Sequence, residues 1–255
     1  MARIRQSFCW WCFARAGEAP DALLRAAAEI GYEAVDLVEE AHWPAIREHG
    51  MRISAVMGHQ SLTDGLNRRE NHSRIERQIN EALATAEKWG ILNLVCFSGN
   101  RNGLDDLSGA VICAEGLRRV SRRAEDAGVN LVLELLNSKV DHRDYQCDRT
   151  QWGVAVCEMV ASPRVLLLND LYHMQIMEGD LIRNLQTHAA HIGHYHTAGN
   201  PGRRDLDDAQ EIAYPAVMRA ILATGYEGYV AHEFVPRGAA APALRAAYHL
   251  CDVSL

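Results

Sequence analysis

The sequence lacks several features that define other classes of protein. No segment has the length of apolar residues that crosses a bilayer, and the start MARIRQSFCWWCFAR has no apolar core of signal-peptide length. Basic residues are in the minority, with 26 Lys and Arg against 33 Asp and Glu, and the formal net charge is -7. Because nucleic acid binding requires clustered basic residues, this charge argues against a nucleic acid partner. We therefore expect a cytoplasmic protein with no membrane partner and no nucleic acid partner.

Phosphate-binding glycine motifs and a disulfide framework are also missing. Neither GxGxxG after the first predicted strand nor GxxxxGK[ST] occurs. The seven cysteines are an odd number scattered along the chain, which favours reduced thiols. Cys9 and Cys12 form C-W-W-C, a spacing found in redox pairs and in half of some zinc sites. Since no second CxxC accompanies it, we interpret the pair as two thiols at the end of the first strand.

What the sequence does contain is a regular alternation of apolar strand patterns and amphipathic helix patterns. Strands are predicted at residues 3–9, 34–38, 52–57, 92–97, 130–133, 165–168, 192–196 and 229–233. Helices are predicted at residues 20–30, 42–49, 73–89, 107–127, 151–160, 181–188, 215–223 and 240–251. Parallel strands require such crossovers, so we predict a single (β/α)8 TIM-barrel domain over residues 1–255. A doubly wound open sheet is the structural competitor.

Four potential metal ligands stand at the ends of the last four predicted strands: Glu134, Asp170, His196 and Glu233. Neighbouring barrel strands lie about 4.8 Å apart, so these side chains can converge on one ion. Three carboxylates and an imidazole suit Mg²⁺, Mn²⁺ or Co²⁺, whereas Zn²⁺ usually takes more nitrogen or sulfur. The competing interpretation is that each acid caps a nearby helix or pairs with an arginine.

This ligand set predicts a reaction. Four protein ligands leave two octahedral positions for the carbonyl and hydroxyl oxygens of a small hydroxy-carbonyl substrate. Chelation acidifies the proton on the adjacent carbon and stabilises the enediolate formed when that proton leaves. Glu134 and Glu233 would then move the proton, one as base and the other as acid.

Four further residues are candidates for substrate binding. His173 follows Asp170 by three residues and could hydrogen-bond a substrate oxygen, with a solvent-facing histidine as the alternative. Arg203 could bind a carboxylate bidentately, with an exposed loop arginine as the alternative. His59 and Asn137 lie just beyond predicted strands and would line the pocket.

These segments resemble those of a known family. LELLN (133–137), NDLYHMQIMEGDL (169–181), IGHYHTAGNPGR (192–203) and HEFVP (232–236) are similar to the hydroxypyruvate isomerase family. That family belongs to the xylose isomerase-like sugar phosphate isomerase/epimerase group, which includes the ketose 3-epimerases. The resemblance implies a TIM barrel, a divalent metal and paired glutamates that match Glu134 and Glu233. This sequence departs from the family pattern at His196, where bacterial hydroxypyruvate isomerases have Gln, and at Asp36, where Glu is usual.

Together these observations predict a metal-dependent isomerase that interconverts hydroxypyruvate and tartronate semialdehyde through a cis-enediolate. A ketose 3-epimerase or related sugar isomerase is the closest alternative, since the same metal and glutamates would serve. An endonuclease of this barrel group would need a richer ligand set and a basic face. A non-catalytic metabolite-binding barrel would typically have lost one of the two glutamates. A homo-oligomer is compatible with this prediction.

Overall fold

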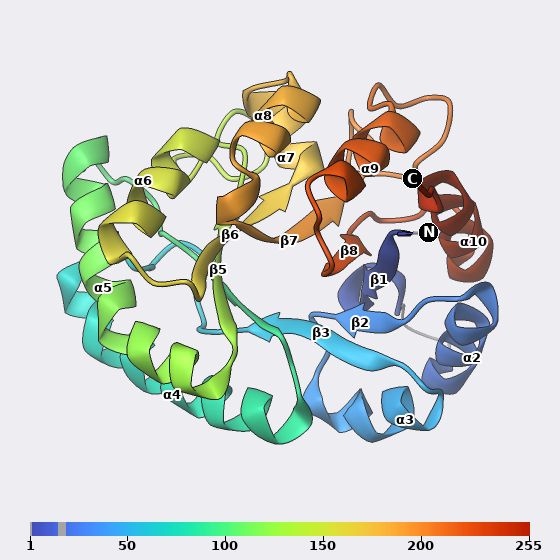
Figure 1. Cartoon of the computed structure of the whole chain (residues 1–255), viewed down its shortest axis with the longest axis horizontal. Helices are drawn as coiled ribbons and strands as arrows, with labels where there is room; N and C mark the ends of the chain where they lie inside the picture. The colour runs from blue at the N-terminus through green and yellow to red at the C-terminus, as the bar shows by residue number, and fades with distance from the viewer. Residues whose placement is uncertain (1, 15–18) are drawn as a thin grey trace. The chain divides into compact units, whose positions relative to one another are not determined.

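The computed structural model describes residues 2–14 and 19–255. Its eight parallel strands form a closed barrel in the order in which they occur along the chain (Figure 1). The strands are β1 Arg5–Cys9, β2 Ala34–Asp36, β3 Arg52–Met57, β4 Asn93–Cys96, β5 Asn130–Leu135, β6 Val165–Asp170, β7 Ile192–Thr197 and β8 Tyr229–His232. The predicted TIM-barrel fold class is therefore confirmed.

Helices connect the strands as the alternation predicts. The main helices are α2 Pro20–Ile30, α3 Trp43–Glu48, α4 Arg69–Trp89, α5 Asp106–Ala127, α6 Thr150–Val160, α8 Leu181–Thr187, α9 Tyr214–Ala223 and α10 Ala240–Cys251. Two short α-helices were not predicted, α1 Trp10–Phe13 and α7 Leu171–Met177, and each begins directly after a strand. Two 3-10 turns, η1 Glu40–His42 and η2 Ala189–His191, complete the set.

Proline and glycine set the two ends of helix α2. Pro20 occupies the first turn of α2, where its missing N–H has no intrahelical partner to lose. Gly31 ends the helix with φ 117, and a Cβ there would lie 2.8 Å from the Tyr248 hydroxyl. Glycine thus meets both a backbone and a packing requirement at this position.

The chain groups into two compact units. The first contains residues 1–54, 180–187 and 195–255, and the second contains residues 55–179 and 188–194. That the whole chain acts as one domain stays a prediction. Each unit carries part of the set of candidate site residues.

In the second unit, consecutive strands pair in parallel. Leu94 of β4 lies opposite Leu131 of β5, and Glu134 of β5 lies opposite Leu168 of β6. Helix α5 packs against α4 and α6 on the outside of these strands (Figure 1). Most residues of β5 and β6 are buried, as expected for strands covered on both faces.

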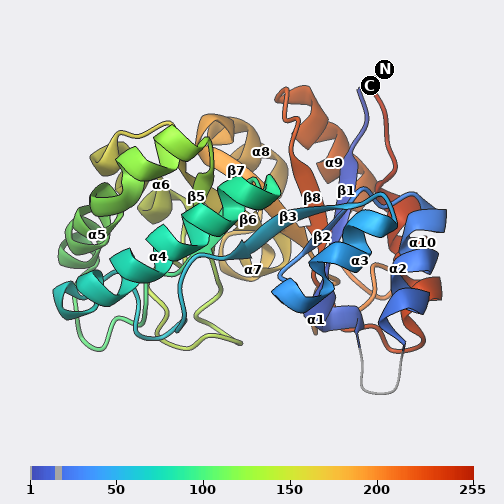
Figure 2. The same ribbon diagram turned by 90° about the horizontal axis from the view of Figure 1, so that it is seen from below.

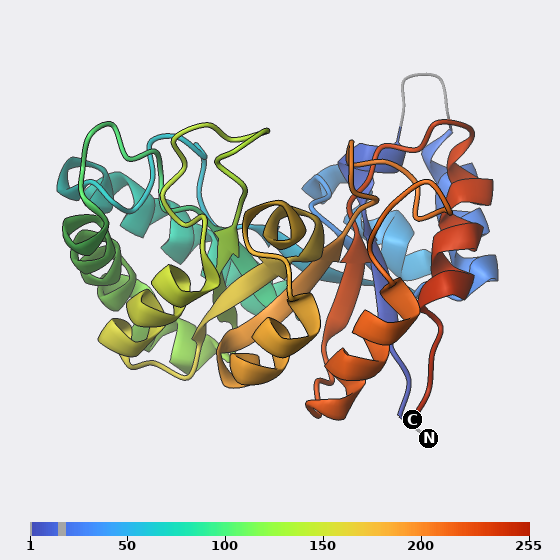
Figure 3. The ribbon, with the colours of Figure 1, turned by 90° about the horizontal axis from the view of Figure 1, so that it is seen from above.

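In the first unit, β1 lies between β2 and β8, and β8 also pairs with β7. Helix α10 packs against α2 and α9 (Figure 2), and α8 packs against α9 (Figure 3). Arg3 and Ser254 form an antiparallel bridge, so the two chain ends lie side by side, as Figures 2 and 3 show.

All seven cysteines are buried free thiols, as the sequence predicts. Over residues 2–14 and 19–255, no helix combines the length and the apolar character that crossing a bilayer would demand.

Candidate functional site

In the first unit, four ligand-type side chains come from strand ends. Cys9 and Asp36 are the last residues of β1 and β2, and they are direct partners in the strand register. His196 belongs to β7, one residue before its end. Glu233 follows β8, and its backbone N–H donates to the Thr197 carbonyl at 2.8 Å, which continues the ladder past the assigned strand. Strand pairing therefore fixes the backbone position from which each of these side chains extends.

The carboxylate of Glu233 is held by three groups. Its Oε2 lies 2.5 Å from an Arg203 guanidinium nitrogen and 3.1 Å from His196 Nδ1. Its Oε1 accepts from Trp11 Nε1 at 3.2 Å. Glu233 is only 4% exposed, so these contacts replace much of its lost hydration. The pairing of this acid with an arginine, the competing interpretation for each acid, is realised here.

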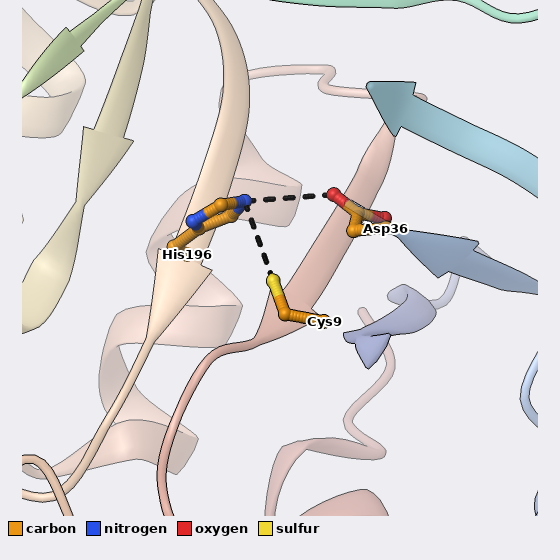
Figure 4. Close-up of side chains that lie close together, drawn as sticks. All are labelled: Cys9, Asp36 and His196. Atoms are coloured by element: carbon orange, nitrogen blue, oxygen red, sulfur yellow. Dashed lines mark hydrogen bonds and ion pairs between the residues drawn. The ribbon is translucent and has the colours of Figure 1, made fainter. Parts of the chain in front are cut away.

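The other nitrogen of His196 faces a second group of ligands. Nε2 lies 3.5 Å from Asp36 Oδ2 and 3.9 Å from Cys9 Sγ (Figure 4). The Ser54 hydroxyl donates to the other oxygen of Asp36. Burial alone would lower the pKa of His196, but the neighbouring Cys9, Glu233 and Asp36 raise it well above its usual value.

Arg203 lies in the loop after β7, just beyond a cis Asn200–Pro201 peptide bond. Its guanidinium carbon sits 5.4 Å from the centre of the Trp11 ring. The Arg203 side chain is 20% exposed, so the alternative of a fully exposed loop arginine does not describe it. Its predicted role in binding a substrate carboxylate stays a prediction.

In the second unit, Glu134 and Asp170 lie on the paired strands β5 and β6. Glu134 is 4% exposed, and its backbone carbonyl accepts from the Tyr145 hydroxyl at 3.0 Å. Asp170 is fully buried and caps α7, because its Oδ1 accepts from the backbone N–H groups of Tyr172 and His173. The capping interpretation is thus realised for one oxygen of Asp170. Its Oδ2 lies 3.7 Å from His173 Nε2.

His173 and Asn137, both predicted to bind substrate, are in direct contact. Asn137 Nδ2 lies 2.6 Å from His173 Nδ1 and 2.6 Å from Asp141 Oδ2. Because an amide nitrogen only donates, His173 Nδ1 accepts and its proton sits on Nε2. His173 is fully buried, so the alternative of a solvent-facing histidine is wrong. The Tyr172 hydroxyl also donates to Asp141 at 2.8 Å.

His59 differs from the other candidates because the backbone engages both of its ring nitrogens. Nε2 accepts from the Phe97 N–H at 2.9 Å, and Nδ1 donates to the Gln60 carbonyl at 3.0 Å. Burial lowers the pKa of His59, which is consistent with this neutral tautomer. A role in lining the pocket stays a prediction, but a hydrogen bond from this ring to substrate would require breaking one of the two contacts.

Sequence reasoning did not assign Asp36, Cys9 or Trp11 to the site. Asp36 ends β2, but the predicted strand ran to residue 38, so the strand-end rule applied to the predicted bounds pointed past it. Cys9 was interpreted as one of two thiols at the end of the first strand, and it is the last residue of β1. Trp11 is 46% exposed and donates to Glu233. Nothing in the local sequence indicates that direction, because it depends on the unpredicted helix α1.

Comparison with known proteins adds an independent line of observation. The xylose isomerase-like TIM barrel family matches residues 24–250 of the chain. A putative hydroxypyruvate isomerase of Homo sapiens is 28% identical over 244 residues, covering 89% of this chain and 88% of the human protein. A 2-oxo-tetronate isomerase of Cupriavidus necator is 33% identical over 123 residues, which are 48% of this chain and 46% of that enzyme.

A solved structure of an AP endonuclease of family 2 from Brucella melitensis superimposes with a TM-score of 0.82 and 24% identity. The superposition covers 96% of this chain and 97% of that chain. At this level of identity the structural likeness establishes the fold alone. The likeness to named isomerases confirms the resemblance read from the four sequence segments.

Proposed function

The chain belongs to the xylose isomerase-like TIM barrel family, and from that premise we propose that it is a divalent-metal-dependent isomerase of hydroxypyruvate. It would interconvert hydroxypyruvate and tartronate semialdehyde by moving a proton between adjacent carbons. The names of the human and Cupriavidus necator relatives support an isomerase acting on a small hydroxy-carbonyl acid.

One observation carries this proposal. Four consecutive strands, β5 to β8, each carry a buried ligand-type side chain at or next to the C-terminal end of the strand. The four residues are at most 4% exposed: Glu134, Asp170, His196 and Glu233. Burying three carboxylates is costly unless they are paired or bind a cation, so a shared ion would account for their burial.

The donor set fits a hard divalent cation such as Mg²⁺ or Mn²⁺, because three of its four members are carboxylates. When bound, such an ion would polarise the carbonyl and hydroxyl oxygens of the substrate and acidify the proton on the intervening carbon. Co²⁺ also suits the set, and Zn²⁺ would prefer more nitrogen or sulfur.

The two glutamates would move the proton. One would take it from the carbon that bears the hydroxyl group, and the other would protonate the neighbouring carbon. Glu233 is oriented for this task by Trp11 and Arg203, which contact its two different oxygens. Glu134 is anchored through its backbone, because its carbonyl accepts a hydrogen bond from the Tyr145 hydroxyl.

The substrate carboxylate would engage Arg203. Since this guanidinium contacts Glu233 Oε2 at 2.5 Å, a second carboxylate would compete for it and release that oxygen for proton transfer. His173, which carries its proton on Nε2, would donate to a substrate oxygen, and Asn137 would hold its ring in place. Binding and activation of the base are thereby coupled.

Isotope exchange tests the proposal. The protein with Mn²⁺ or Mg²⁺ is incubated in deuterated water with hydroxypyruvate, and in parallel with a panel of ketoses. Deuterium at C2 of tartronate semialdehyde and at C3 of recovered hydroxypyruvate is expected. Label at C3 of a ketose instead would identify a ketose 3-epimerase, the closest alternative function. Absence of exchange in every substrate would refute both.

A further inference from the structure

We propose that Cys9, Asp36 and His196 form a second metal site, selective for a thiophilic divalent ion such as zinc. The site itself does not depend on the proposed isomerase function. Its effect on turnover does, because it uses His196, which the proposed catalytic set also needs.

Strand pairing brings the three ligands together. Cys9 and Asp36 are register partners at the ends of β1 and β2, and His196 approaches from β7. The three ligand atoms all lie within 4.8 Å of one another, and each residue is fully buried. Figure 4 shows the thiol, the carboxylate and the imidazole pointing toward a common region.

The spacing of the ligand atoms is close to that of a tetrahedral zinc site. Zinc bonds of about 2.3 Å to sulfur and about 2.0 Å to nitrogen or oxygen imply a sulfur–nitrogen separation of about 3.5 Å and a nitrogen–oxygen separation of about 3.3 Å. The observed separations are 3.9 Å for Cys9 Sγ to His196 Nε2 and 3.5 Å for Nε2 to Asp36 Oδ2. Small side-chain shifts would therefore complete the geometry. A water molecule would take the fourth position.

The charges also balance. A thiolate, a carboxylate and a neutral imidazole together offset the two positive charges of the ion, which matters because all three residues are buried. The thiolate is the form of cysteine that binds metal, so metal binding would release the proton of the Cys9 thiol. Sulfur among the ligands separates this site from the oxygen-rich catalytic set, because zinc, cadmium and cobalt accept thiolate whereas magnesium does not.

Asp36 and His196 each make a hydrogen bond through the atom that would not bind the ion. The Ser54 hydroxyl donates to the Asp36 oxygen that faces away from His196. Glu233 Oε2 lies 3.1 Å from His196 Nδ1, so it accepts that N–H and leaves the lone pair on Nε2, toward the thiol. A carboxylate behind a ligating histidine is the usual support of a zinc site.

Occupancy of this site has a consequence for the proposed isomerase. A neutral imidazole offers one lone pair, so His196 can serve either ion but not both at once. An ion held by Cys9 and Asp36 would withdraw His196 from the oxygen-rich set. Zinc is therefore expected to inhibit the magnesium- or manganese-dependent reaction.

Cobalt titration tests the site without reference to activity. Metal-free protein is titrated with Co²⁺, and a thiolate-to-cobalt charge-transfer band that zinc abolishes is expected. The band should disappear in Cys9→Ser and persist in Cys12→Ser, a buried cysteine three residues away. Asp36→Asn should weaken zinc binding at least about tenfold. No band in the wild type, or a band that survives Cys9→Ser, would overturn the proposal.

X-ray absorption of the zinc-loaded wild-type protein answers the same question without a substitution. One sulfur neighbour at about 2.3 Å is expected, and a shell of nitrogen and oxygen alone would overturn the site. Glu134→Gln separates the two proposals, because it should retain the cobalt–thiolate band even if no isomerase activity exists. If the isomerase is active, zinc should inhibit the wild type and lose that effect in Cys9→Ser.

Discussion

Replacing Glu233 by glutamine is the sharpest perturbation of the proposed proton transfer. Glutamine preserves the shape of the side chain and can still accept from Trp11 Nε1, but it removes the charge that faces Arg203 and His196. It also removes a proton carrier and a metal ligand. Activity should therefore fall far more than stability.

The magnitudes follow from those contacts. Loss of one acid–base group lowers the rate by about 10²- to 10⁴-fold, or about 3–5 kcal/mol in activation free energy. Losing a charged hydrogen-bond partner costs about 1–3 kcal/mol of the free energy of unfolding, which leaves most domains folded.

Two measurements decide the outcome: kcat for hydroxypyruvate with Mn²⁺, and urea unfolding followed by circular dichroism. Glu227→Gln is the matched control, because this glutamate is exposed just before β8. A folded Glu233→Gln enzyme with kcat within a factor of ten of the wild type would refute the paired-acid mechanism.

Four further predictions concern the metal, the substrate, a helix cap and a histidine. Chelation of divalent ions should abolish turnover, and adding Mn²⁺ or Mg²⁺ should restore it in the same steady-state assay. Arg203→Ala should raise the KM for hydroxypyruvate about tenfold or more, because a hydrogen bond to a charged group is worth about 1.5–3 kcal/mol. The KM for neutral ketoses should change little, because they have no carboxylate for Arg203 to bind. Glu178→Ala should lower the free energy of unfolding by about 1–2 kcal/mol in urea titrations, since Glu178 caps α6 through the Thr150 N–H at 2.9 Å and hydroxyl at 2.7 Å. His59→Gln should reduce the loss of stability on acidification, measured as the slope of unfolding free energy against pH.

The sign of the His59 effect follows from its lowered pKa. Below about pH 6.5 the unfolded chain binds a proton at this histidine that the folded protein does not, so its contribution to stability is lost as the pH falls. An unchanged slope in the variant would contradict this reasoning.

Each of the three substitutions has a control at another residue of the same type. Arg204→Ala tests whether any loop arginine affects KM, and Glu158→Ala removes an exposed glutamate from α6 itself. His249→Gln removes an exposed histidine from α10. Equal effects in a variant and its control would show that the specific contact is not responsible. Full activity in a metal-free sample would contradict the requirement for an ion.

Much of the fold could be predicted because local signals and barrel pairing agree. Helices α2 and α10 and strand β3 have the predicted bounds, since a proline, a glycine or a change of periodicity marks their ends. Helix α7 was missed because it follows β6 without a spacer. Asp170 is at once the last residue of that strand and the cap of the helix, a double role that periodicity does not reveal.

The site could be predicted only as far as strand ends determine it. Periodicity located Glu134 and Glu233. It did not predict which hydrogen bonds the neighbouring side chains make. His59 illustrates the limit, because its position beyond β3 suggested substrate binding whereas the Phe97 N–H and the Gln60 carbonyl engage its nitrogens. Asp36 was missed because the predicted strand ran to residue 38, two residues beyond the end of β2.

The most direct test of the central claim is a crystal structure of the protein grown with Mn²⁺ and measured for anomalous scattering. One manganese is expected at coordination distance from a single oxygen or nitrogen of each of four residues: Glu134, Asp170, His196 and Glu233. A manganese bound elsewhere, or one that lacks either glutamate among its ligands, would contradict the shared-ion mechanism.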